Sequence, residues 1–259
     1  EAMVGRSLDR MFPEIPAPED QIVLEVRGLS SGLGYFSDVN FSVAKGEILG
    51  IAGLVGAGRT ELVRAMVGVD PLSGGQVLLD GQDISPRSPK DAIRNGIILV
   101  PEDRKQQGLV LQHSIGENFA YANMNQVARK GWFTKKRVRN FADVGILKFG
   151  VKGISQQNAD ELSGGNQQKA VIAKWLARNP RVVVLDEPTR GIDVGARSSI
   201  YDIIVGLAAE GVSIIIVSSD LEEVLGVSNR VMVMAQGRQA GILKRNEAND
   251  VSVMELATK

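Results

Sequence analysis

Residues 48–67 read ILGIAGLVGAGRTELVRAMV, and this stretch decides the class of fold. The apolar run at 48–52 predicts a buried strand, and residues 60–67 predict a helix. Between them, the glycines of GLVGAGRT let backbone N–H groups surround phosphate oxygens, while the helix N-terminus adds a favourable dipole. Strand, glycine-rich loop and helix in this order predict a phosphate-binding loop in an α/β protein. The residues expected to contact the phosphates are Gly53, Leu54, Val55, Gly56, Ala57, Gly58, Arg59 and Thr60.

The last two residues of this loop are polar. Thr60 offers a hydroxyl to a Mg²⁺ ion. Arg59 departs from the usual motif, which has a lysine whose compact ammonium fits between the outer phosphates, because arginine carries its charge on a longer planar fork. We therefore expect nucleotide binding to survive this change better than catalysis. The alternative is that the glycines form only a tight turn.

A second stretch, RVVVLDEPTRGID at 181–193, adds a pair of carboxylates. Its apolar run at 182–185 is typical of a strand buried on both faces of a parallel sheet, and ligands usually bind beyond the carboxyl end of such a strand. Asp186 is expected to hold Mg²⁺, directly or through water, and Glu187 to polarise the attacking water. A polar strand end with a structural role is the alternative.

A third stretch, LSGGNQQK at 162–169, predicts the start of a helix that runs to about residue 173. Ser163 is expected to cap this helix, while two glycines leave its first amides bare for an anion. A plain capped helix is the alternative. The letters LSGGQ also occur at 72–76, where a short apolar run follows, so we expect that copy to form a hairpin turn.

Walker-type loop, signature helix and acid-tipped strand together resemble the ATP-binding cassette (ABC) family, from about residue 21 to the C-terminus. The resemblance implies an α/β P-loop NTPase cassette with a mostly parallel core sheet, a small antiparallel β subdomain and a helical subdomain. Within the family, GLVGAGRTEL, PEDRKQQGL, LSGGNQQK and DEPTRGIDVGA are similar to the second cassette of the double-cassette ATPases of bacterial monosaccharide importers. Ribose, galactose, arabinose and xylose systems are the relatives that this implies.

The resemblance also implies roles for single residues. ATP and Mg²⁺ are the expected cofactors, and Asp186 and Glu187 form the Walker B pair. Two cassettes of this family face head to tail, so the signature residues Ser163, Gly164 and Gly165 would complete the partner's site. Asp193 would lie in the loop that meets the opposite cassette.

Two positions differ from the family pattern. Glu102 stands where most cassettes place a glutamine that touches Mg²⁺, and it could still reach the metal. Ser219 occupies the place of the switch histidine, and the single histidine, His113, lies elsewhere in the chain. Loss of one well-aimed charge-stabilising donor costs roughly a hundred- to a thousandfold in turnover. We therefore expect a slow or silent ATPase site on this chain, although Glu187 remains, with weak activity for the isolated domain and the useful hydrolysis at the partner's site.

Residues 1–19 are expected to be an inter-cassette linker or a disordered tail, and residues 20–259 one ATP-binding domain with a helical subdomain at about 103–161. The first residue is glutamate, which suggests a fragment of a longer chain. Met3, Val4, Leu8, Met11 and Phe12 form a possible amphipathic turn in the linker. A basic cluster with two aromatic rings indicates a solvated face or a contact with lipid headgroups or a membrane subunit: Arg129, Lys130, Trp132, Phe133, Lys135, Lys136, Arg137 and Arg139.

The composition agrees with such a protein but does not by itself discriminate between functions. The chain has 30 basic and 30 acidic residues among 259, which argues against a nucleic-acid binder. It has no cysteine, which fits a cytoplasmic protein, and its apolar stretches are far shorter than the roughly 20 residues that span a bilayer. The expected location is the cytoplasmic face of the bacterial inner membrane, as a peripheral protein.

The expected partners are the first ABC cassette of the same protein, membrane permease subunits and, indirectly, a periplasmic sugar-binding protein. Two other functions stay open: a non-transport ABC ATPase that acts on nucleic acid or ribosomes, and a regulatory nucleotide-binding module that never hydrolyses ATP. Binding of the chain to RNA or DNA at moderate salt would favour the first of these.

Overall fold

The computed structural model describes residues 12–128 and 132–259. Within these ranges the chain divides into two compact units, each described by itself below. The first unit contains the residues up to Leu99, Arg181–Glu187 and Tyr201–Lys259, and the second contains Val100–Pro180 and Pro188–Ile200. Met3, Val4, Leu8, Met11, Arg129 and Lys130, to which the sequence assigned roles, lie outside the described residues.

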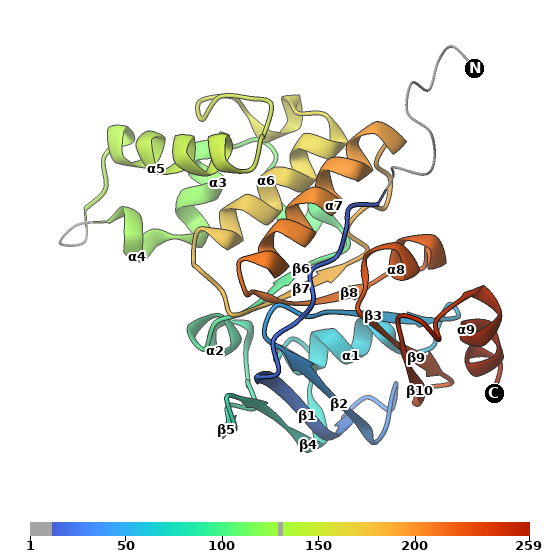
Figure 1. Ribbon diagram of the computed structural model, residues 1–259. Helices are drawn as coiled ribbons and strands as arrows, with labels where there is room; N and C mark the ends of the chain where they lie inside the picture. The colour runs from blue at the N-terminus through green and yellow to red at the C-terminus, as the bar shows by residue number, and fades with distance from the viewer. Residues whose placement is uncertain (1–11, 129–131) are drawn as a thin grey trace, which may run out of the picture. The chain divides into compact units, whose positions relative to one another are not determined.

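A six-stranded sheet forms the core of the first unit (Figure 1). Its strand order is β10-β9-β3-β8-β7-β6, with β3 parallel to both β9 and β8, β7 parallel to β8, and β10 antiparallel to β9 at one edge. The strands β7 and β8 are buried along their whole length, as their unbroken apolar runs predict. The bounds are β3 Ile48–Gly53, β6 Ile97–Val100, β7 Val182–Asp186, β8 Ser213–Val217, β9 Arg230–Ala235 and β10 Arg238–Lys244.

A second, antiparallel sheet has the order β2-β1-β4-β5, with β1 Ile22–Ser31, β2 Val39–Ala44, β4 Leu72–Leu79 and β5 Gln82–Asp83. The expectation that LSGGQ at 72–76 forms a hairpin turn is wrong, because these residues begin β4 and pair with β1. The physical reason is close backbone packing at an irregularity of the β1–β4 register. A Cβ on Gly75 would lie 2.5 Å from the Gly28 carbonyl oxygen, so only glycine lets the two strands meet there.

Helix α1 (Arg59–Met66) lies between the two sheets of the first unit (Figure 1). Its apolar residues belong to one core cluster with side chains from β1, β2, β3, β7, β8 and β9. Helices α8 (Leu221–Val227) and α9 (Asp250–Ala257) pack against β3 and β9 around a separate cluster. The sequence-based expectation of a mostly parallel core sheet with a small antiparallel sheet is confirmed.

The first unit begins with an irregular segment that is held to the core. The Phe12 ring lies 5.1 Å from that of Tyr201, between ring centroids, and the Asn229 side-chain amide donates to the Pro16 carbonyl at 2.9 Å. The backbone N–H of Glu19 donates to the Lys45 carbonyl at 2.9 Å. The linker at 1–19 and the domain bounds given above stay predictions. No helix among the described residues is both long and apolar enough to cross a bilayer.

The second unit is helical. Helices α3, α5 and α6 pack round a small apolar cluster that includes Ile115, Phe119 and Ala173 (Figure 1). A Cβ on Gly145 of α5 would lie 2.3 Å from the Phe119 ring, so glycine sets the close approach of α3 and α5. The helices not yet given bounds are α2 Pro89–Arg94 of the first unit, α3 Ile115–Ala122, α4 Met124–Val127, α5 Lys135–Lys148, α6 Gly164–Leu176 and α7 Val194–Ala209, with a π-helical turn η2 Arg104–Gly108 and a 3₁₀ turn η3 Ala159–Glu161.

A buried lysine joins two of these elements. The Lys174 ammonium donates to the Gly108 carbonyl, which ties α6 to the end of η2. Burial lowers the pKa of Lys174 from 10.5 to about 8. Because the pKa in the folded state is below that in the unfolded state, the buried charge reduces stability fully below about pH 8, and this cost disappears as the pH rises toward 10.5.

We expect Lys174→Met, which removes this titration and keeps a long unbranched side chain, to show the effect as a pH-dependent difference. The variant's free energy of unfolding, relative to the wild type, falls by about 2 kcal/mol between about pH 7 and about pH 10. Denaturant titrations at each pH measure it. The control is Lys136→Met at an exposed position, whose difference from the wild type is expected to stay constant. A constant difference for Lys174→Met as well would contradict the interpretation.

Candidate functional site

The phosphate-loop sequence lies where it was predicted, between β3 and α1. Gly56 and Gly58 have φ of 81° and 89°, conformations that side chains with a Cβ rarely adopt. No side chain caps the N-terminus of α1, and a Cβ on Gly56 would meet no atom within 4 Å. Val55 is 94% exposed at the tip of the loop. The loop therefore presents main-chain amides round an open space at a helix N-terminus, which suits a phosphate group.

Arg59 is buried at the first position of α1, and its guanidinium points to the end of β8. Its Nη1 donates to the Ser218 carbonyl at 2.5 Å. Burial lowers the pKa of Arg59, and the nearby Glu187 and Asp186 carboxylates oppose that shift. One N–H group of the Arg59 guanidinium is therefore already bonded to the protein's own backbone. A lysine ammonium is a compact group without this planar fork of donors.

Asp186 ends β7 and faces the first turn of α1. The Thr60 hydroxyl donates to its Oδ1 at 3.1 Å. Burial raises the pKa of the Asp186 carboxyl to about 6, while the Thr60 hydrogen bond acts in the opposite direction. A buried carboxylate with a raised pKa beside a hydroxyl gains stability from a cation, because the cation offsets the lost hydration of the charged form.

The next residue, Glu187, has a left-handed backbone with φ of 48°, which is costly for a side chain of this size. Its N–H donates to the Val217 carbonyl at 2.8 Å, which holds this conformation at the carboxyl end of β7. Its Oε2 accepts a hydrogen bond from the Ser219 hydroxyl at 3.0 Å. The structure therefore brings together Arg59, Thr60, Asp186, Glu187 and Ser219 at the carboxyl ends of β3, β7 and β8.

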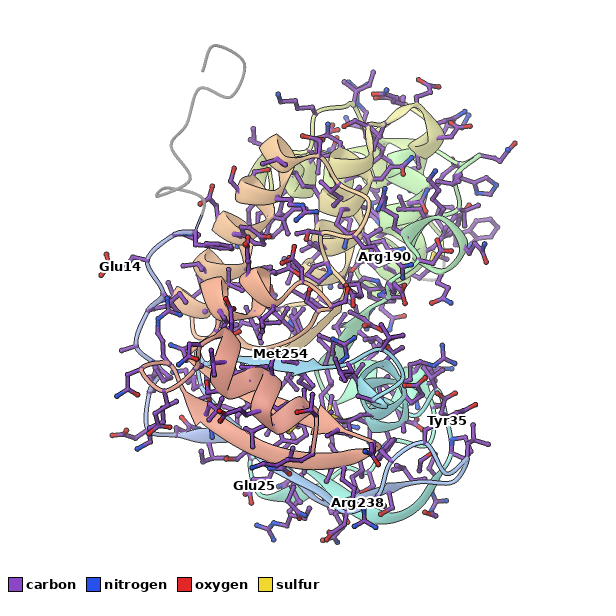
Figure 2. All side chains as sticks on the ribbon, turned by 90° about the vertical axis from the view of Figure 1, so that its right-hand side faces the viewer. Glu14, Glu25, Tyr35, Arg190, Arg238 and Met254 are labelled. Carbon is purple, nitrogen blue, oxygen red and sulfur yellow. The ribbon has the colours of Figure 1, made fainter. Side chains whose placement is uncertain are left out.

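The remaining predicted residues belong to the second unit. Glu102 follows β6, and its carboxylate forms an ion pair with Arg190, which is labelled in Figure 2. Arg104 binds the same segment through its backbone, since Nη1 donates to the Arg190 carbonyl at 2.9 Å and Nη2 to that of Gly191 at 3.3 Å. Two side chains thus join the segment after β6 to the segment after β7. No sequence pattern predicts the Arg104 contact, because it joins residues 86 and 87 positions apart.

Ser163, Gly165 and Asp193 line one pocket of about 250 Å³ in the second unit, together with Lys152 and Asn166. Ser163 is the N-cap residue of α6, as expected, but its hydroxyl accepts no hydrogen bond from the helix backbone. The Asn166 amide donates to the Ser163 Oγ at 2.9 Å instead. Gly164 lies beside this tip, where a Cβ would approach the Arg104 guanidinium to 2.8 Å.

Two aromatic residues, Tyr35 and Phe36, lie shortly before the phosphate loop in the sequence, where a nucleotide base could stack on a ring, and they differ in exposure. Phe36 is 3% exposed and belongs to the core cluster, whereas Tyr35 is 52% exposed, and Figure 2 shows it pointing outward. Of the two, only Tyr35 offers a ring face to a ligand. His113 is exposed, and its Nδ1 lies 2.6 Å from the Tyr121 hydroxyl, as expected of a surface histidine.

An open amide loop at a helix N-terminus, beside an acid-tipped strand of a parallel sheet, defines a nucleotide-binding P-loop protein. The family described as "ABC transporter" matches residues 36–190, more than half of the chain. The chain therefore belongs to the ABC transporter family of ATPases.

Among curated proteins, the ribose import ATP-binding protein RbsA of Bacillus licheniformis is 47% identical over 257 residues, which cover 99% of the chain and 52% of that protein. A putative ribose/galactose/methyl galactoside import ATP-binding protein of Agrobacterium fabrum is 46% identical over 260 residues, with 99% and 51% covered. The chain spans about half the length of these relatives.

Solved structures agree on the fold. A nucleotide-free ATP-binding cassette from an ABC transporter superposes with a TM-score of 0.79 at 23% identity, over 92% of the chain and all of that protein. CbiO1 from Clostridium perfringens, part of the ABC transporter complex cbiONQ, gives a TM-score of 0.73 at 26% identity, over 88% and 90%. The predicted cassette fold is confirmed.

The residues present fit a magnesium nucleotide. The described residues hold no group of three or more His, Cys, Asp or Glu side chains arranged to bind a metal by themselves. Mg²⁺ normally keeps several waters and binds one or two carboxylates together with substrate phosphates. The hydroxyl of Thr60 and the carboxylate of Asp186, 3.1 Å apart beside the amide loop, supply the protein's share of such a set.

Proposed function

We propose that the chain is the second cassette of a double-cassette sugar importer and couples ATP binding and hydrolysis to carbohydrate uptake. The names of the relatives at 46–47% identity support ribose or a related sugar as the cargo of the system. The partners are then the first cassette of the same protein, the membrane permease and, indirectly, a periplasmic sugar-binding protein. The location is the cytoplasmic face of the bacterial inner membrane. Residues 1–19 are the linker between cassettes, and 103–161 is the helical subdomain.

The residues divide the work between two sites. At the chain's own site, the amides of residues 53–60 bind the phosphates, Thr60 and Asp186 hold Mg²⁺, and Glu187 positions the attacking water. Bound Mg²⁺ neutralises charge on the outer phosphates. Ser163, Gly164, Gly165 and Asp193 serve the partner cassette's site in trans. Glu102 keeps its proposed role near the metal, although its carboxylate is paired with Arg190.

The difference between the two sites is supported by one observation: the chain's own phosphate site departs from the family pattern, whereas the N-terminus of α6 does not. Arg59 directs a donor to the Ser218 carbonyl, and Ser219 stands beside Glu187 where the family has a histidine. The tip of α6, by contrast, keeps its first amides free of any side-chain cap. The chain's own ATPase site is therefore slow or silent, while its signature helix serves the partner.

Single-turnover hydrolysis by the isolated chain tests this proposal. With saturating Mg-ATP, we expect a rate at least about a hundredfold below that of an ordinary cassette pair, since a charge-stabilising donor is missing. Calorimetry is expected to show that Mg-ATP still binds, with Gly56→Asp as the control that abolishes binding by adding a charged side chain to the open loop. A rate within about tenfold of an ordinary pair would rule out the slow site.

A further inference from the structure

Ser163, at the N-terminus of α6, makes an unusual hydrogen bond. A serine at this position normally accepts a hydrogen bond from a backbone N–H of the first turn. The side chain three residues later normally accepts from the backbone N–H of that serine. Here the pattern is reversed, because the Asn166 side chain donates to the Ser163 hydroxyl oxygen at 2.9 Å and no side-chain cap is formed.

The orientation of the Asn166 amide follows from its other partner. The backbone N–H of Lys152 donates to the Asn166 Oδ1 at 2.9 Å. A backbone N–H can only donate, so the oxygen of the amide faces Lys152 and the NH₂ group faces Ser163. The Ser163 oxygen therefore acts as an acceptor, and its single proton is left to donate elsewhere.

The segment that supplies this backbone N–H is held in place. Val151 is 5% exposed and belongs to the apolar cluster of the second unit, and its N–H donates to the Ile146 carbonyl at 3.0 Å. A Cβ on Gly153 would lie 2.9 Å from the Leu162 side chain, which shows how closely this segment packs just before Ser163. The backbone N–H of Lys152 is thus held in place, and its hydrogen bond sets the orientation of the Asn166 amide.

Ser163 and Asn166 line the pocket of about 250 Å³ together with Lys152, Lys169 and Asp193. Two lysines in its lining and the bare helix N-terminus favour an anion there. We propose that Asn166 is a positioning residue, which prevents Ser163 from capping its own helix and turns the serine proton toward a phosphate oxygen of the nucleotide. This inference rests on the proposed function, in which the signature tip completes a nucleotide site in trans.

The change Asn166→Asp tests it with almost no change in shape. A carboxylate has no N–H to give, so it accepts the Ser163 proton and repels an incoming phosphate. In the full-length transporter, we expect kcat for ATP hydrolysis to fall about a hundredfold, as on loss of one aimed donor, with little change in KM. Asn166→Gln keeps the donating NH₂ group and is expected to retain most of the activity. Asn140→Asp, the same change at an exposed position of α5, is the control and is expected to have no effect.

A double-mutant cycle with Ser163→Ala separates positioning from general damage. The cycle uses Asn166→Leu, which removes the amide without adding a charge. If Asn166 acts through Ser163, then Asn166→Leu adds no further loss of kcat in the Ser163→Ala background. If the losses of the two single variants multiply in the double variant, or if Asn166→Asp alone keeps full activity, the inference is overturned. A large loss for Ser163→Ala in the same experiment still supports the proposed function. Full activity of Ser163→Ala would overturn the proposed function, and the inference with it.

Discussion

We expect the variant Gly165→Ala to lower ATP turnover by the full-length transporter about a hundredfold. Gly165 is a buried residue in the first turn of α6, and it lines the pocket of about 250 Å³ that Ser163 and Asp193 also line. A Cβ there would lie 2.6 Å from the Cβ of Ala196, a separation that real structures essentially never show. Either the helix tip or the segment after Asp193 has to move, and a misplacement of about 1 Å in a site that orients reactants costs on the order of a hundredfold.

Steady-state hydrolysis measures this effect, with nucleotide affinity recorded in parallel. The control Gly206→Ala makes the same chemical change in α7, where the added Cβ meets no atom within 4 Å. Alanine is also the better helix former, so this control is expected to keep full turnover and equal or slightly higher stability. Normal turnover of Gly165→Ala would mean that the tip of α6 does not close a reacting site.

The second large effect is a gain. We expect the double change Arg59→Lys and Ser219→His to raise the single-turnover rate of the isolated chain about a hundredfold. Lysine supplies a compact ammonium without the fork that holds Arg59 to the Ser218 carbonyl. A histidine at 219 stands next to Glu187, where it offers a ring N–H to the reacting phosphate or water. Even one such interaction, when well placed, contributes on the order of a hundredfold.

Quenched-flow hydrolysis at chain concentrations that favour pairing measures the gain. Adding Glu187→Gln to the double variant is the control, and it is expected to return the rate to the starting level because the group that positions the water is lost. If the double variant binds Mg-ATP more tightly but hydrolyses it no faster, these two departures do not limit the chemistry.

Much of the fold and half of the site are local properties of the sequence. The strand, loop and helix at 48–67 needed only an apolar run and correctly spaced glycines, because glycine adopts the positive φ of Gly56 and Gly58 without the steric cost that a Cβ adds. The buried strand at 182–186 needed only its unbroken apolar residues. The place of Asp186 and Glu187 in the site could be predicted as well, because the two acids stand at the carboxyl end of that strand.

The parts that the sequence could not supply depend on contacts between distant residues. Ser163 was expected to cap its helix through its side chain, whereas its hydroxyl accepts a hydrogen bond from the Asn166 side chain, whose oxygen accepts from the Lys152 backbone N–H. The letters at 72–76 looked like a turn, and only their pairing with β1 makes them a strand. Neither partner is specified by spacing, since tertiary contacts override local preference.

The contact of Arg104 with the carbonyls of Arg190 and Gly191 has a consequence for how this protein tolerates change over evolutionary time. Carbonyl oxygens are present whatever side chain a residue carries, so a change of side chain at position 190 leaves its acceptor in place, whereas the φ of 67° at Gly191 favours glycine there. Position 104 has no such freedom, since bridging two successive peptide groups takes a rigid donor with two arms, which arginine alone provides. Selection on this contact therefore falls on positions 104 and 191.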